Sequence, residues 1–209
     1  MFLYDCVKMK RGKKHIVAVL IIVAIVSSLL YLSHTNRAFF QGDSVSRLPD
    51  RHIRNRDISS DYLELMFRRH GGVYFNHSGT EILVNVAFFE RDSLILHERV
   101  TSITASDDDE FSGYVIWGLT TERNLLSELR VNLRTNRGLS QNYFDFSLLD
   151  FEPQLIWGSG VTSGMIEHDR RYIMEVWTSG NTISPDGNAF NPSILRENGN
   201  TAILYIVFK

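Results

Sequence analysis

The chain has 209 residues, of which 44% are hydrophobic and 11% aromatic, and its formal net charge at pH 7 is −2. This composition is sufficient for the core of one globular domain, and a charge near zero excludes the basic footprint typical of a nucleic-acid-binding protein. The single cysteine, Cys6, lies near the N-terminus, so the rest of the chain forms no internal disulfide and must be stabilised by packing.

The first element in chain order is an uncharged apolar run at 16–32, which follows five cations between Lys8 and Lys14. Seventeen helical residues rise about 25 Å, which is close to the thickness of a bilayer core. Because clustered cations stay on the cytoplasmic side, the pattern predicts a basic cytoplasmic tail at 1–15 and a transmembrane signal anchor at 16–34.

A cleaved signal peptide is the alternative to an anchor. Cleavage after Ala38 would place Asn36 at a position that requires a small residue, so the sequence favours an uncleaved anchor. A cysteine-free exported domain is typical of bacterial envelopes. We therefore expect a single-pass protein of the bacterial inner membrane, with its N-terminus in the cytoplasm and its C-terminal domain in the periplasm.

A polar segment at 35–59 follows, and it reads as a tether between the anchor and an exported domain at 60–209. The domain is expected to begin with one short helix, because Asp61 and Glu64 have capping-box spacing. Apolar residues at helical spacing come next, and Gly71 and Gly72 would end the helix near residue 70.

After Gly72 the apolar residues recur with period 2, which predicts strands. The expected strands are Val73–Asn76, Glu81–Glu90, Ser93–Thr104, Phe111–Thr120, Ser127–Arg134, Asn142–Leu149, Pro153–Gly158, Arg171–Thr178 and Thr201–Phe208. The acidic run Ser106–Glu110 is expected to be a turn, and Ser179–Asn200 a long polar loop.

One helix followed by many short strands predicts a mainly β domain, either an antiparallel barrel of eight or nine strands (lipocalin-like) or a sandwich. The terminal strand AILYIVF favours the barrel, because pairing of the last strand with the first would remove both edges of the sheet.

Motifs for catalysis are incomplete in this chain. Ser159 lacks the glycines two positions before and after it that a nucleophile elbow requires, and His97-Glu98 lacks the second histidine of a zinc-protease motif. We therefore expect no enzymatic activity, no metal site and no cofactor.

Aromatic residues on the predicted strands are the remaining candidates for a binding site. A barrel of eight strands is just wide enough to enclose one small ligand. The residues expected near such a lipophilic pocket are Phe88, Tyr114, Trp117 and Trp177. Packing in the core is the alternative role for each of them.

The layout from KMKRGKK through AILYIVF resembles the small envelope partners of membrane-bound transcription regulators, of the FidL-like, VtrC and ToxS type. The resemblance implies an exported domain that pairs with the exported domain of a regulator, in signal transduction and virulence regulation. It also implies a lipophilic ligand such as a bile salt in some pairs. The resemblance rests on layout, and it transfers no ligand residue to this chain.

Two functions are therefore expected from the sequence. The first is a regulatory subunit that forms a heterodimer with a membrane-anchored, single-span protein and has no direct contact with nucleic acid. The second is a structural or assembly component of an envelope secretion or pilus system. The predicted cytoplasmic tail is too short to signal alone, so any output must pass through a partner.

Overall fold

The computed structural model describes most of the residues from 48 onward and one short segment before them. The described residues are 21–28, 48–56, 67, 69–122, 125–149, 151, 155–157, 161, 163–180 and 188–209. The chain divides into two compact units, Met1–Pro49 and Asp50–Lys209, and each unit is described by itself.

In the first unit, residues 21–28 form an exposed helical segment. Among the described residues, no helix combines the length and the apolar character that a membrane crossing requires. The predicted anchor at 16–34 lies mostly outside the described residues, and the predicted cytoplasmic tail lies wholly outside them. Both stay predictions.

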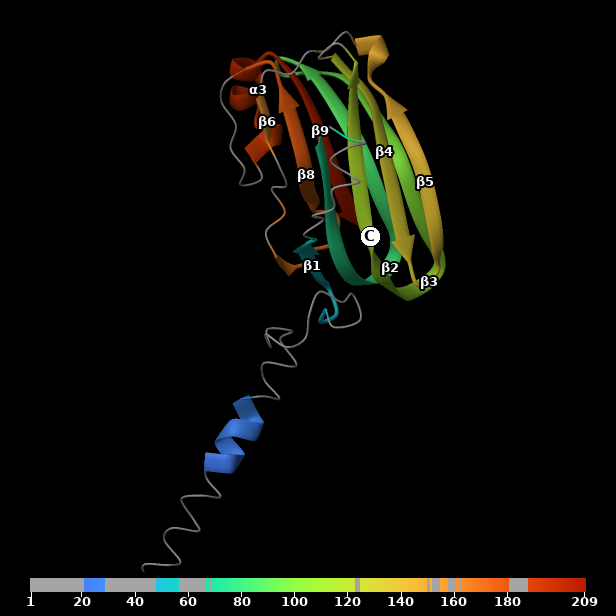
Figure 1. Ribbon diagram of the computed structural model, residues 1–209, viewed down its shortest axis with the longest axis vertical. Coiled ribbons are helices and arrows are strands. Elements are labelled where there is room, and N and C mark those ends of the chain that lie inside the picture. The colour runs from blue at the N-terminus through green and yellow to red at the C-terminus, as the bar shows by residue number, and fades with distance from the viewer. Residues whose placement is uncertain are drawn as a thin grey trace, which may run out of the picture. The chain divides into compact units, whose positions relative to one another are not determined.

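The second unit is mainly β, as predicted, and its described strands form one antiparallel sheet (Figure 1). The strands are β1 (His52–Asn55), β2 (Arg69–Glu90), β3 (Ser93–Glu122), β4 (Leu125–Thr135), β5 (Gly138–Asp145), β6 (Leu155–Trp157), β7 (Gly164–Met165), β8 (Arg171–Thr178) and β9 (Asn200–Phe208). Their order in the sheet is β5-β4-β3-β2-β9-β8-β6, and β1 pairs with both β2 and β7.

The sheet is open, so the prediction of a closed barrel is wrong. The last strand, β9, does pair with an early strand, β2, but it lies in the middle of the sheet and has β8 on its other side. Strands β5 and β6 stand at the two ends of the order and do not meet. Pairing of the terminal strand therefore places it centrally and removes no edge.

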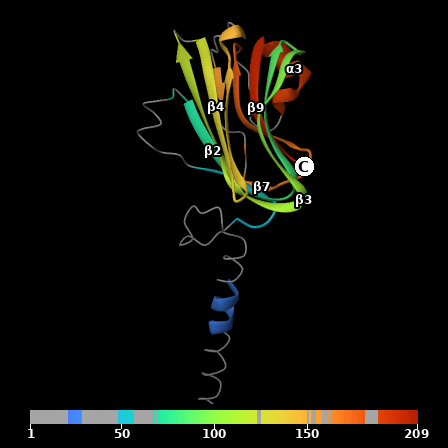
Figure 2. The same cartoon turned by 90° about the vertical axis from the view of Figure 1, so that its right-hand side faces the viewer.

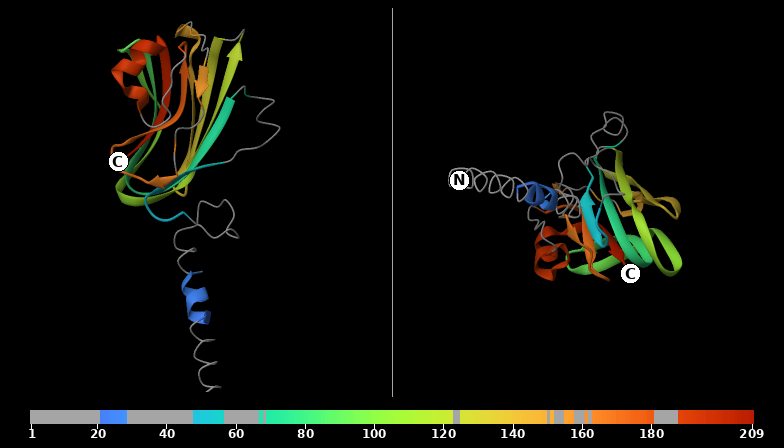
Figure 3. Two further views of the ribbon diagram at one scale, coloured as in Figure 1. Left: turned by 90° about the vertical axis from the view of Figure 1, so that its left-hand side faces the viewer. Right: turned by 90° about the horizontal axis from the view of Figure 1, so that it is seen from below.

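A bend in the long hairpin β2–β3 folds this sheet into two layers (Figures 2 and 3). At the bend, Gly79 pairs with Asp109 and Glu81 pairs with Thr104, so β3 has four residues opposite the single residue Thr80. Such an excess on one strand bends the ladder. The predicted turn at Ser106–Glu110 is therefore wrong, because β3 continues through it.

The two layers are defined by this bend. The first layer contains β1, β7, β4, β5 and the parts of β2 and β3 that pair with each other from Gly79 back to Arg69. The second layer contains β9, β8, β6 and the remaining parts of β2 and β3.

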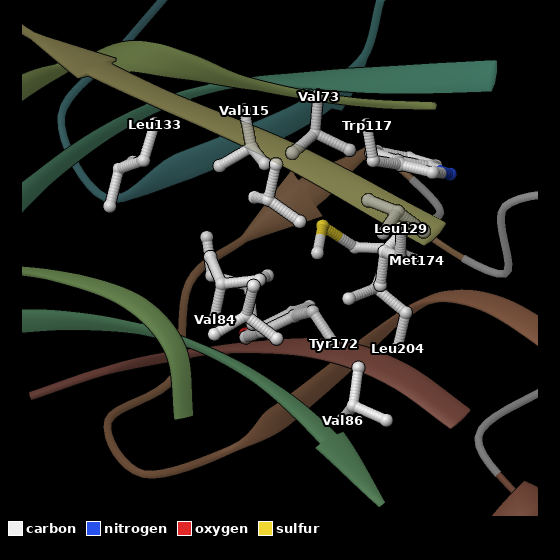
Figure 4. Close-up of a cluster of buried hydrophobic side chains, with 14 of the residues drawn as sticks. Val73, Val84, Val86, Val115, Trp117, Leu129, Leu133, Tyr172, Met174 and Leu204 are labelled. Atoms are coloured by element: carbon white, nitrogen blue, oxygen red, sulfur yellow. The ribbon is translucent and has the colours of Figure 1, made fainter. Parts of the chain in front are cut away.

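The main core lies between the two layers (Figure 4). Because alternate residues of a strand point to opposite faces, β2, β3, β4 and β9 contribute mainly alternate side chains to this core. The first layer contributes Val73, Val115, Trp117 and Leu129, among others. The second layer contributes Val84, Val86, Met174 and Leu204, among others.

A second, smaller cluster covers the opposite side of β8 and β9. It includes Ala189 of the 3₁₀ helix η3 (Asn188–Phe190) and Leu195 of helix α3 (Pro192–Asn198). The Asn191 side chain accepts a hydrogen bond from the Ser193 N–H and so caps α3. The predicted loop Ser179–Asn200 therefore contains ordered helical turns, and its residues 181–187 lie outside the described ones.

Two further predictions change at the start of the domain. His52–Asn55, which the sequence places in the tether, form β1 and pair with β2. Gly71 and Gly72 lie within β2 and do not end a helix. Most of the predicted helix from Asp61 lies outside the described residues, but its last two residues belong to β2.

Candidate functional site

The first layer has an outer face, which we define as the side of its strands turned away from the main core. Residues paired directly across antiparallel strands point to the same side. Ile116 on β3 pairs with Asn132 on β4, which pairs with Gln141 on β5. The next row along these strands consists of Gly118, Arg130 and Tyr143.

These two rows form the floor of a groove of about 620 Å³. One wall is the ring of Phe67, which lies against Gly118. A Cβ atom at residue 118 would stand 2.6–2.7 Å from three atoms of that ring, so only glycine permits the contact. The exposed ring of Tyr143 also lines the groove, from the edge strand β5.

The polar groups of the groove are amides and one ion pair. Glu128 and Arg130 pair with each other along β4. The Thr120 hydroxyl connects β3 to β4 where their register shifts, because it accepts from the Glu128 N–H at 3.1 Å and donates to the Glu128 carbonyl at 3.2 Å. With the aromatic rings, these groups suit non-covalent binding of an amphipathic surface or ligand.

A row of arginine and tyrosine residues lies beside the groove on the same outer face. Arg54, Tyr74, Tyr114 and Arg134 pair across β1, β2, β3 and β4. The guanidinium of Arg56 lies 4.3 Å from the ring centre of Tyr114 and 4.9 Å from that of Tyr74. Cation–π contacts hold this guanidinium on the face, which is therefore suited to bind acidic groups.

Behind the groove, a buried carboxyl group links the two layers. Glu175 on β8 is 2% exposed, and it accepts a hydrogen bond from the indole N–H of Trp117 on β3. The Arg69 Nε lies 3.4 Å from the other carboxyl oxygen, but its side chain is 43% exposed. Burial raises the pKa of the Glu175 carboxyl, while Trp117, Arg69 and His70 oppose the rise.

Glu175 points into the core because β8 changes register beside it. Ile173 pairs with Tyr205 and Glu175 pairs with Leu204, so Met174 is the extra residue of a bulge. Trp117 reaches the carboxyl because its indole lies over Gly71, where a Cβ would stand 2.4 Å from the ring. Trp117 also lines the groove, so this residue touches both features.

The predicted ligand residues do not form one site. Phe88, Trp117 and Trp177 all belong to the main core, where the ring of Phe88 lies 5.4 Å from that of Phe151. Tyr114 lies on the outer face, on the other side of the sheet. Residues 114 and 117 are an odd number of positions apart on one strand, so their opposite sides could have been predicted.

Sequence reasoning missed the residues that build the groove and the buried hydrogen bond between Glu175 and Trp117. The sequence does single out Glu175, because it is the only acidic residue in the apolar strand RYIMEVWT. Phe67, Gly118 and Tyr143 had none, because their proximity depends on strand pairing and on the path of the chain before β2. Among the described residues, no group of three or more His, Cys, Asp or Glu side chains is placed to hold a metal ion.

Replacing Gly118 by alanine is expected to displace Phe67 from the groove, because the new Cβ would overlap its ring. The expected cost is about 1–3 kcal/mol of unfolding free energy, measured by urea denaturation. Gly138→Ala is the matched control, since a Cβ there meets nothing within 4 Å. In a Phe67→Ala background the cost of Gly118→Ala should largely disappear, and an unchanged cost would contradict the contact.

Comparison of the chain with family models, with curated proteins and with solved structures finds no match.

Proposed function

We propose that this chain is a regulatory subunit, anchored in the bacterial inner membrane, whose periplasmic domain binds a single-span protein partner. The partner proposed is a membrane-bound transcription regulator, as the layout resemblance implies. The observation that carries the proposal is the groove on the outer face, with the arginine–tyrosine row beside it. The cations between Lys8 and Lys14 support the proposed topology.

The chemistry of the outer face supports a protein partner. Tyrosine and arginine are enriched at protein–protein interfaces, where they supply large contact areas and directional hydrogen bonds. Arg134 is exposed and forms no ion pair with any described residue. A partner segment with acidic and aromatic side chains would match both the guanidinium groups and the groove.

A lipophilic ligand is a second candidate, supported by the size and lining of the groove. Small-molecule sites usually have volumes of roughly 300–1,000 Å³, and the groove falls within this range. We therefore place the proposed amphiphile, such as a bile salt, against Phe67 and Ile116. It should raise the melting temperature of the wild-type chain and have little effect on the Gly118→Ala variant.

Site-specific photo-crosslinking in cells tests the protein partner. A photoreactive amino acid at Arg134 of the full chain is expected to capture another membrane protein, identified by mass spectrometry as one with a single span and a cytoplasmic DNA-binding domain. The same amino acid at Glu98, which is exposed on β3 in the second layer, is the control and should not capture it.

Equal capture from both positions, or none from Arg134, would contradict the proposed partner surface. Capture of secretion or pilus components from Arg134 would favour the structural role over the regulatory one.

A further inference from the structure

β5 presents one of the long unpaired edges in the described part of the sheet. Another is Ser93–Thr104 of β3, which pairs only with β2 among the described strands, but register shifts interrupt that pairing. β5 pairs with β4 in a regular register and with no other described strand. It has eight residues, most of them exposed, whereas β6 has three and β7 has two. Natural edge strands usually carry lysine, proline or a bulge that blocks further pairing. Gly138–Asp145 has none of these, so the edge is open to another strand.

The hairpin defines which backbone groups face this edge. Thr135 and Gly138 pair across the two-residue turn, so they form a hydrogen-bonded pair, and such pairs alternate along the ladder. Residues 138, 140, 142 and 144 thus turn their N–H and C=O groups toward β4. Residues 139, 141, 143 and 145 turn theirs outward, where a new antiparallel strand could bond them.

The side chains of this edge complement themselves in one register. If Gln141 pairs with Gln141 of a second copy on a two-fold axis, Leu139 lies opposite Tyr143 of that copy, and the reverse. Leu139 and Tyr143 are 56% and 68% exposed, and their contact would bury both. In the same register, Asp145 lies beside the turn of the second copy that carries Arg137.

Neighbouring registers fit less well. Antiparallel strands keep their faces only when the register moves in steps of two. Moving the axis to residue 140 places Leu139 opposite Gln141, and moving it to residue 142 places Leu139 opposite Asp145. Hydrogen bonds from Ser147 hold the pKa of the Asp145 carboxyl below its usual range, so this residue is charged and would be a poor neighbour for leucine.

We infer that β5 is a self-association edge, through which two copies of this chain form a symmetric dimer with Gln141 on the two-fold axis. The interface is isologous, because each copy contributes the same strand. The proposed dimer uses Gln141 and Tyr143, which also line the groove, whereas the partner is tested at Arg134 on β4. The dimer is measured on the purified chain without the partner. The two tests therefore fail separately.

A charge swap at Gln141 tests the dimer. In the full chain, Gln141→Lys would place two cations against each other across the axis, and Gln141→Glu would place two carboxylates there. Each variant alone is expected to weaken dimerisation at least tenfold, measured by analytical ultracentrifugation of the detergent-solubilised protein. An equimolar mixture of the two variants should dimerise again, because the unlike charges then face each other.

The matched controls are Asn188→Lys and Asn188→Glu, which make the same charge changes at an exposed residue of η3. They should leave dimerisation unchanged, and circular dichroism should show that all four variants are folded. A monomeric wild-type chain, a dimer that tolerates Gln141→Lys, or a mixture that stays monomeric would overturn the inference.

Discussion

Replacing Glu175 by glutamine is expected to stabilise the domain at neutral pH and to leave its stability in mild acid almost unchanged. The buried carboxyl loses a proton less readily in the folded chain than in the unfolded chain, because burial disfavours its charged form. Glutamine keeps the shape and an acceptor for the Trp117 N–H, but it has no charge to bury.

The direction of this pKa shift determines how the free energy of unfolding changes with pH. The unfolded carboxyl has a pKa near 4.5, and the folded one has a higher pKa. Stability provided by the neutral carboxyl is therefore fully present below about pH 4.5 and is lost as the pH rises through the folded pKa. The difference in unfolding free energy between Glu175→Gln and wild type should grow over this window and then become constant.

Urea denaturation between pH 4 and pH 8 measures this difference, since other titrating groups contribute equally to both proteins. Trp117→Phe is the complementary variant, because it removes the hydrogen bond that opposes the rise in pKa. It should steepen the loss of stability with pH, and this effect should vanish in the double variant with Glu175→Gln. Parallel pH curves for wild type and Glu175→Gln would contradict the buried acid.

Replacing Gly113 by alanine is expected to be among the most damaging single changes in the sheet. Gly113 pairs with Thr135 of β4, and a Cβ there would stand 2.0 Å from the Arg134 carbonyl oxygen. That obstacle is backbone, so no rotation of a side chain can relieve it. We expect a loss of about 3 kcal/mol, or a fall in melting temperature of about 6–12 °C for a domain of this size.

Gly138→Ala again serves as the matched control, because both residues lie on the β3–β4–β5 hairpins and only one has a close neighbour. Hydrogen exchange should report the position of the damage, with protection lost first where β3 pairs with β4. A melting temperature within a degree of wild type for Gly113→Ala would show that the two strands do not approach this closely.

Much of the strand content could be predicted from period 2 alone. Arg171–Thr178 was predicted with the bounds that β8 has, and Ser127–Arg134 lies within β4. Trp117 and Trp177, which the sequence predicts near a ligand pocket with core packing as the alternative, both lie in the main core. Local patterns succeed here because β4 has one clearly apolar side, whereas β8 is a short apolar run that is buried on both sides.

Predictions failed where the outcome depended on residues distant in sequence. The sequence predicts that Gly71 ends a helix. It lies instead in β2, where the indole of Trp117 covers it. The acidic run after Ala105 has the composition of a turn. However, β2 and β3 pair on both sides of this run, so the run is part of β3 and lies at the bend.

The sequence by itself determined that the domain is mainly β, that it forms no disulfide after Cys6 and that its core is rich in aromatic residues. Only the tertiary structure decided that the sheet stays open, that Phe67 lies on Gly118 and that Glu175 meets Trp117. The physical reason is that hydrophobic alternation is a local property of each strand. Sheet order, register and close approach arise from pairing between segments far apart in the chain, which no local pattern encodes.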